Sequence, residues 1–193
     1  MRRIALIALI AFALLYTALP TAAQQTPADK APSAGAGPIL VMETSRGVIE
    51  FETYPEDAPK TVEHMLALVK RRFFNGQRIH RADPKFVIQL GDPQTRDYTK
   101  RDLWGRGSAA TSGKPIGVAE ISKRRMHGRG AVGMAHAGDP TQADSQFYIT
   151  RRAAPELNGK YVVWGQVISG MDVVDKAEIG DVIKRISVKP TPQ

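Results

Sequence analysis

Two stretches decide the fold: residues 78–92, RIHRADPKFVIQLGD, and residues 133–150, GMAHAGDPTQADSQFYIT. Each contains a short apolar or aromatic run, at 86–90 in the first stretch and at 146–150 in the second. Such runs, bounded by Gly, Pro and Asp, predict β-strands. The polar residues that precede the second run predict a loop. Neither run is followed by a helical pattern, which argues against an alternation of strands and helices.

The strand pattern continues on both sides of these stretches. Residues 39–44 and 48–54 flank a Ser45-Arg46-Gly47 turn and predict a β-hairpin. Further strands are predicted at 131–135, 161–168 and 182–188. Many strands with few helical connections favour either an antiparallel sandwich or a closed barrel.

One long helix is predicted, and it begins at Pro59, because proline suits the first helical turn. Its buried stripe consists of residues that recur at the 3.6-residue period: Ala58, Val62, Met65, Leu66 and Val69. A second, short helix is predicted at 171–177.

The amino-acid composition limits the classes of protein to which the chain can belong. The 193 residues are 42% apolar and 24% charged, which suits one globular domain with a substantial core. The chain has no cysteine, which excludes disulfides, thiolate zinc sites, iron–sulfur clusters and a cysteine nucleophile. Its net charge of +8 favours anionic partners. The basic segment 92–130 is interpreted as a solvated loop or a face for anionic partners rather than a nucleic-acid surface.

The N-terminal residues predict export. Residues 1–23 combine a basic start, an apolar run and small residues at 21–23, the pattern of a cleaved signal peptide. An uncleaved anchor is the alternative, although the run is shorter than the roughly 20 residues that a bilayer requires. Residues 24–38 are rich in Ala, Pro and Gly and predict a flexible tether. The folded domain is therefore expected at 39–189, with a tail at 190–193.

Several common motifs carry no weight here. The match to G-x-G-x-x-G at 128–133 follows basic loop residues and precedes a poor helix, so it does not predict a dinucleotide site. The four histidines lack metal-ligand spacing, and no G-x-S-x-G elbow is present. We therefore expect neither a metal nor another cofactor.

The two stretches resemble the signature regions of cyclophilins, the cyclosporin-binding peptidyl-prolyl cis-trans isomerases. The same resemblance extends to GVIEF at 47–51, APKTV at 58–62 and FNG at 74–76, and it covers roughly 39–188. It implies a mainly β fold: a closed eight-stranded antiparallel β-barrel capped by two helices, with a proline-binding groove on an outer face. Trp164 is expected in the barrel core.

The resemblance also implies a site. It places the catalytic arginine at Arg81, with His80 beside it and Gln89 able to orient the guanidinium. His80 can instead simply pack or hydrogen-bond within the barrel. The substrate-binding positions that the resemblance implies are Phe86, Val87, Ala135, His136, Gln146, Tyr148, Leu157 and Tyr161.

Some of these positions depart from the commonest eukaryotic pattern. Val87 stands in place of a methionine, His136 of an asparagine and Tyr148 of a phenylalanine. The last two substitutions look like bacterial members of the family. Glu156 takes the place of a tryptophan and Tyr161 that of a groove histidine, so we expect cyclosporin to bind weakly.

The chemistry explains why one arginine suffices. A twisted prolyl amide has a localised nitrogen lone pair, which can accept a hydrogen bond that the planar ground states cannot. Arg81 is always charged and carries several donors in a fixed fork. The expected function is therefore isomerisation of X–Pro bonds during the folding of exported proteins, in the periplasm.

The expected partners are proline-containing peptides and unfolded exported proteins. We expect a monomer that binds no nucleic acid and has no stable membrane association after cleavage. Two alternatives remain at this stage: a chaperone or adaptor that binds proline segments without catalysis, and a surface protein that binds polyanions through its basic loop. An isomerisation assay separates the first function from both.

Overall fold

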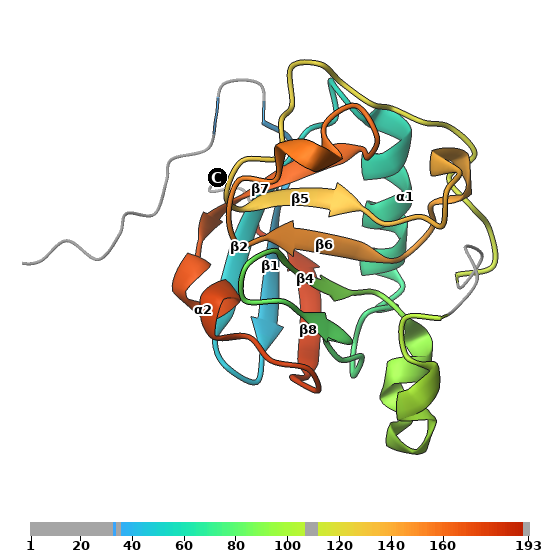
Figure 1. The fold of residues 1–193 in the computed structure, drawn as a ribbon, viewed down its shortest axis with the longest axis vertical. Helices are drawn as coiled ribbons and strands as arrows, with labels where there is room; N and C mark the ends of the chain where they lie inside the picture. The colour runs from blue at the N-terminus through green and yellow to red at the C-terminus, as the bar shows by residue number, and fades with distance from the viewer. Residues whose placement is uncertain (1–32, 34–35, 107–111, 191–193) are drawn as a thin grey trace, which may run out of the picture.

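A single antiparallel sheet organises the chain (Figure 1). The computed structural model describes residue 33 and residues 36–106 and 112–190. Within them the sheet has eight strands in the order β3-β4-β6-β5-β7-β2-β1-β8. Their bounds are β1 Ile39–Thr44, β2 Val48–Thr53, β3 Arg81–Ala82, β4 Val87–Leu90, β5 Ala131–Met134, β6 Phe147–Thr150, β7 Val163–Ser169 and β8 Ile183–Val188.

The sheet curls into a barrel that does not close completely, so the expectation of a closed barrel was wrong in that detail. The terminal strands β3 and β8 form no ladder; one isolated bridge, Arg78 to Val182, joins the chain just before each of them. The reason is the length of β3, which has only two residues. Backbone bonds such as Ile79 N–H to the Asp181 carbonyl (3.0 Å) hold the two edges together.

Two α-helices cover parts of the barrel, as expected. Helix α1 (Pro59–Lys70) packs against β8, and α2 (Met171–Lys176) lies against β2. The buried stripe of α1 differs from the prediction, because Thr61 and Leu68 are also buried while Leu66 is only half-buried. Four short 3₁₀ helices complete the described chain: η1 Pro93–Arg96, η2 Tyr98–Leu103, η3 Pro140–Gln142 and η4 Pro155–Leu157.

The barrel interior is filled by aromatic and aliphatic side chains. Trp164 is 1% exposed and meets Phe51 and Phe147 edge to face, each at a ring-centroid distance of 5.6 Å. Such edge-to-face pairs add to the stabilisation from burial alone. The expectation that Trp164 belongs to the core is confirmed.

The predicted signal segment 1–23, most of the predicted tether and residues 191–193 lie outside the described residues. Where the tether is described, it contacts β2: the Gly37 N–H donates to the Thr53 carbonyl at 2.8 Å, and Ser33 donates to Glu52 from both its backbone N–H and its hydroxyl. No helix of the described chain is long and apolar enough to cross a membrane.

Candidate active site

The strand register places the candidate residues in one row on the outer face of the sheet. Arg81 pairs with Gln89 across β3 and β4, Gln89 pairs with Tyr148 across β4 and β6, and Tyr148 pairs with Gly133 across β6 and β5. Directly paired residues of neighbouring strands point to the same face. Phe147 and Ile149, the neighbours of Tyr148, fill the core, so this row faces outward.

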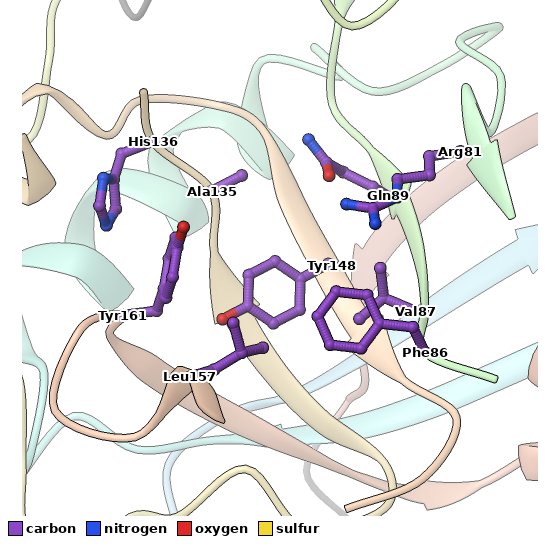
Figure 2. A pocket seen from close by; sticks show the side chains of 9 residues that line it. All are labelled: Arg81, Phe86, Val87, Gln89, Ala135, His136, Tyr148, Leu157 and Tyr161. Atoms are coloured by element: carbon purple, nitrogen blue, oxygen red, sulfur yellow. The ribbon is translucent and has the colours of Figure 1, made fainter. Parts of the chain in front are cut away.

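A groove of about 160 Å³ lies along this row (Figure 2). Val87 and Gln89 come from β4, Ala135 and His136 follow β5, and Leu157 ends η4. The full set of lining residues is Arg81, Phe86, Val87, Gln89, Ala135, His136, Tyr148, Leu157 and Tyr161. The structure therefore brings together nine of the eleven residues predicted for the site, and leaves His80 and Gln146 outside the lining.

Arg81 presents an unpaired cation at one end of the groove. Its side chain is exposed, and it forms no ion pair or hydrogen bond with any other described residue. Its guanidinium carbon lies 5.2 Å from the centroid of the Phe86 ring, a cation–π arrangement that orients the group. All five donors are thus available to a ligand.

Gln89 does not orient Arg81 through a direct hydrogen bond in the described chain. Its amide Nε2 instead donates to Oε1 of Gln146 at 3.0 Å. Gln146 therefore lies behind the lining and fixes the Gln89 side chain, while its own backbone carbonyl accepts from the Ala135 N–H at 2.9 Å.

His80 lies behind Arg81, with its ring against Gly105: a Cβ on that glycine would come within 2.8 Å of the His80 Cδ2. Neither ring nitrogen has a hydrogen-bond partner among the described residues. Burial lowers the pKa of His80 to about 4, against a smaller opposing effect of the Asp92 carboxylate. The ring is therefore neutral near pH 7 and has no contact with the groove, which favours a packing role.

Two aromatic side chains and a histidine form the opposite end of the groove. The His136 ring stacks on Tyr161 at a centroid distance of 4.3 Å, and its Nε2 donates to the Lys160 carbonyl at 3.0 Å. Tyr161 in turn meets Tyr148 edge to face at 6.0 Å. The stacking on Tyr161 and the hydrogen bond to Lys160 leave the His136 ring with little freedom to rotate.

Glu156 lies at the rim and does not line the groove. Its carboxylate pairs with Arg152 at 3.2 Å, and the guanidinium of Arg152 lies 5.9 Å from the centroid of the Phe86 ring. Phe86 is thus flanked by two cations, Arg81 and Arg152. Sequence reasoning missed Arg152, because nothing in the sequence signals a contact between residues 86 and 152.

Two further residues at this site were also missed. His127 is 2% exposed and hydrogen-bonds to the Tyr148 hydroxyl behind the groove. Gly133 leaves space for the Tyr148 ring, since a Cβ there would lie 2.4 Å from Cζ of the tyrosine. In the sequence, His127 was only one of four histidines without metal-ligand spacing. Gly133 is the partner of Tyr148 in the strand register, and that register was not predictable.

The curled eight-stranded sheet and its outer groove place the chain in the cyclophilin-like class of folds. A family model described as cyclophilin type peptidyl-prolyl cis-trans isomerase/CLD matches residues 39–193. The chain therefore belongs to the cyclophilin-type peptidyl-prolyl cis-trans isomerase family, and its activity is the isomerisation of X–Pro peptide bonds. The resemblance seen in the sequence is confirmed.

Relatives over most of the chain carry the same activity in their names. The chain is 36% identical to a probable peptidyl-prolyl cis-trans isomerase of Brucella abortus (strain 2308), over 90% of this chain and 86% of that one. It is 38% identical to peptidyl-prolyl cis-trans isomerase B of Bacillus subtilis (strain 168), over 73% of this chain and 90% of that one.

Solved structures agree with the fold. A crystal structure of a Cryptosporidium parvum cyclophilin type peptidyl-prolyl cis-trans isomerase aligns with a TM-score of 0.69 at 27% identity, over 80% of this chain and 99% of that one. A structure of the same protein in the presence of the dipeptide Ala-Pro aligns with a TM-score of 0.68, also at 27% identity, over 79% of this chain and 99% of that one.

Proposed function

We propose that the groove binds prolyl segments of unfolded exported proteins, and that Arg81 is the catalytic residue that accelerates rotation about their X–Pro bonds. The observation that carries this proposal is the free guanidinium of Arg81 at one end of the groove, beside the apolar side chains of Phe86 and Val87. The Ala-Pro dipeptide present with the Cryptosporidium relative supports a prolyl ligand.

Catalysis has to lower the barrier to rotation about the X–Pro bond. Delocalisation of the nitrogen lone pair into the carbonyl opposes rotation by about 18–20 kcal/mol, and this delocalisation is lost at the twisted transition state. The prolyl nitrogen then becomes an acceptor. A donor directed at it stabilises the transition state and neither ground state, which is the condition for a faster chemical step.

The side chains of the groove have separate roles in this reaction. Arg81 donates to the twisted nitrogen and, through a second donor of its fork, holds the prolyl carbonyl. The pyrrolidine ring occupies the apolar part of the groove between Phe86, Val87 and Leu157, over the Tyr148 ring. Lowering the barrier by about 6 kcal/mol would accelerate rotation roughly 10⁴-fold, within the reach of one charged donor and good positioning.

The other end of the groove holds the residue before proline. The His136 backbone N–H forms no backbone hydrogen bond with the described chain, so it is free to pair with the peptide. Fixing the peptide on this side confines rotation to one bond. The proposed reaction moves no proton.

The proposed clients are exported proteins, because residues 1–23 have the pattern of a secretory signal. A fusion of residues 1–38 to a reporter that is active only after export tests this location. A reporter that stays inactive would contradict it without bearing on catalysis.

Catalysis is tested by following cis–trans exchange of an Ala-Pro peptide by NMR with catalytic amounts of the protein. A chaperone that only binds proline segments would shift the peptide resonances without increasing the exchange rate. Faster exchange that is lost in Arg81→Ala is the expected result.

A further inference from the structure

A buried histidine behind the groove connects two of the groove's walls. His127 Nε2 lies 2.8 Å from the hydroxyl oxygen of Tyr148 in β6, and His127 Nδ1 lies 2.9 Å from Oδ1 of Asn158, which follows η4. The His127 backbone N–H also donates to Asn158 Oδ1, at 2.8 Å. The His127 carbonyl accepts from the Ala154 N–H at 2.7 Å, so each polar group of His127 has a hydrogen-bond partner.

The hydrogen bonds define the protonation of the ring. An amide oxygen only accepts, so the His127 Nδ1 carries the proton and donates to Asn158. In the neutral ring Nε2 is then an acceptor, and the Tyr148 hydroxyl donates to it. Burial lowers the pKa of His127, against smaller opposing effects of Asn158 and of the Glu156 carboxylate, so the neutral form persists near pH 7.

Among the described residues, the Tyr148 hydroxyl has no hydrogen-bond partner besides His127. The tyrosine is 4% exposed, and its ring lies against the β5 backbone, where a Cβ on Gly133 would be 2.5 Å from the hydroxyl oxygen. Figure 2 shows this hydroxyl pointing away from Arg81. Without an acceptor at His127 the hydroxyl would be buried and unpaired, which is costly, and the ring would have to move toward the open groove to reach water.

One end of this hydrogen-bonded chain lines the pocket for the prolyl ring, and the other end adjoins a lining residue. Tyr148 forms its floor, and Asn158 directly follows Leu157, which forms a wall. We propose that His127 is a positioning residue for the isomerase: it holds the Tyr148 ring down and the η4 loop in place, and so keeps the groove open at the width of a pyrrolidine ring. This inference rests on the proposed function, because it concerns the same groove.

A double-mutant cycle tests the role. His127→Phe keeps an aromatic ring but removes the acceptor, so the Tyr148 hydroxyl should drive its ring into the groove and raise KM about tenfold, with kcat within about threefold. Tyr148→Phe removes the hydroxyl that needs the acceptor, and its own KM is the reference value for the second arm of the cycle. The double variant should therefore regain a KM within about threefold of that of Tyr148→Phe, so that the second substitution rescues the first.

Three controls make the outcome specific. His64→Phe removes another hydrogen-bonded histidine, paired with Asp144 at 2.9 Å outside the groove, and should lower the melting temperature while leaving KM unchanged. His127→Gln keeps a strong acceptor within reach of the hydroxyl, whereas His127→Met has similar length and only a weak acceptor, its thioether sulfur. Gln should retain the wild-type KM and Met should not, which keeps the test valid if the phenylalanine variant does not fold.

The dissociation constant of an Ala-Pro peptide, measured by NMR titration, gives a second readout that does not require turnover. If the wild-type chain binds the peptide but does not catalyse, the proposed function fails while the role of His127 is still measured. The role of His127 would be overturned if His127→Phe raised KM by the same factor in the wild-type and Tyr148→Phe backgrounds. It would also be overturned if KM and the dissociation constant were unchanged in both His127→Phe and His127→Met.

Discussion

Replacement of Arg81 by alanine is the most direct test of the mechanism. The side chain is exposed and unpaired within the described chain, and its one contact is the cation–π arrangement with Phe86 at 5.2 Å. Such a contact at an exposed site contributes less than about 1 kcal/mol to stability. The variant should therefore fold, with a melting temperature within a few degrees of wild type.

The effect on catalysis should be much larger. A hydrogen bond from a charged donor contributes about 1.5–3 kcal/mol, and the bond to the twisted nitrogen exists only at the transition state. We expect Arg81→Ala to lower kcat/KM for an X–Pro peptide at least about a hundredfold, equivalent to about 2.7 kcal/mol. Arg81→Lys keeps the charge without the planar fork and should recover only part of the loss.

The structure offers a matched control for this measurement. Arg152 also lies over Phe86, at 5.9 Å, and is also exposed, but it is paired with Glu156 and lies outside the groove lining. Arg152→Ala should keep kcat/KM within about threefold. A folded Arg81→Ala protein with near-normal turnover, or an equal loss in the two variants, would refute the assignment of Arg81 as the donor.

Four further predictions concern the surroundings of the groove. Glu156→Trp should tighten inhibition by cyclosporin about tenfold, because an indole adds apolar area and an N–H donor at the rim; an unchanged inhibition constant would mean that the rim is wrongly assigned. Burial keeps the pKa of His80 at about 4, so kcat/KM should stay flat within about threefold from about pH 6 to 8.5. A steep change of kcat/KM with pH that disappears in His80→Gln would show that His80 transfers a proton instead. Because the folded pKa of His80 lies below its ordinary value of 6.5, the free energy of unfolding should fall as pH drops from 6.5 toward 4, as chemical denaturation at several pH values can show. Gly133→Ala should displace the Tyr148 ring and lower both the free energy of unfolding, by about 1–3 kcal/mol, and kcat/KM, whereas wild-type values for both would contradict the close approach.

Strands with alternating or continuous apolar residues were predictable from the sequence, and β1, β2, β4 to β8 lie within two residues of their predicted positions. Strand β3 was not predicted, because two residues cannot display a period. The four 3₁₀ helices were missed for a similar reason, since each has only three to six residues.

The groove was predictable only through the resemblance, residue by residue, and its supporting contacts were not predictable at all. Nothing local in the sequence links His127 to Tyr148 and Asn158, which lie 21 and 31 residues away. The contact of Arg152 with Phe86 likewise joins residues that are far apart in the sequence, whereas its ion pair with Glu156 is a local i,i+4 pair. These long-range contacts depend on tertiary structure, whereas sequence patterns report mainly local structure.

The register of β3, the shortest strand of the barrel, decides which side chain faces the groove. Arg81 faces the groove because β3 pairs with β4 in the register Arg81 to Gln89. A slip of one residue would turn Arg81 to the other face of the sheet and present Ala82 in its place. What opposes the slip lies outside β3: Ile79, which precedes the strand, is 1% exposed in the core, and the bridge from Arg78 to Val182 fixes the chain before it. The position of the donor is thus set by core packing two residues away, which allows the catalytic side chain itself to remain exposed and unpaired.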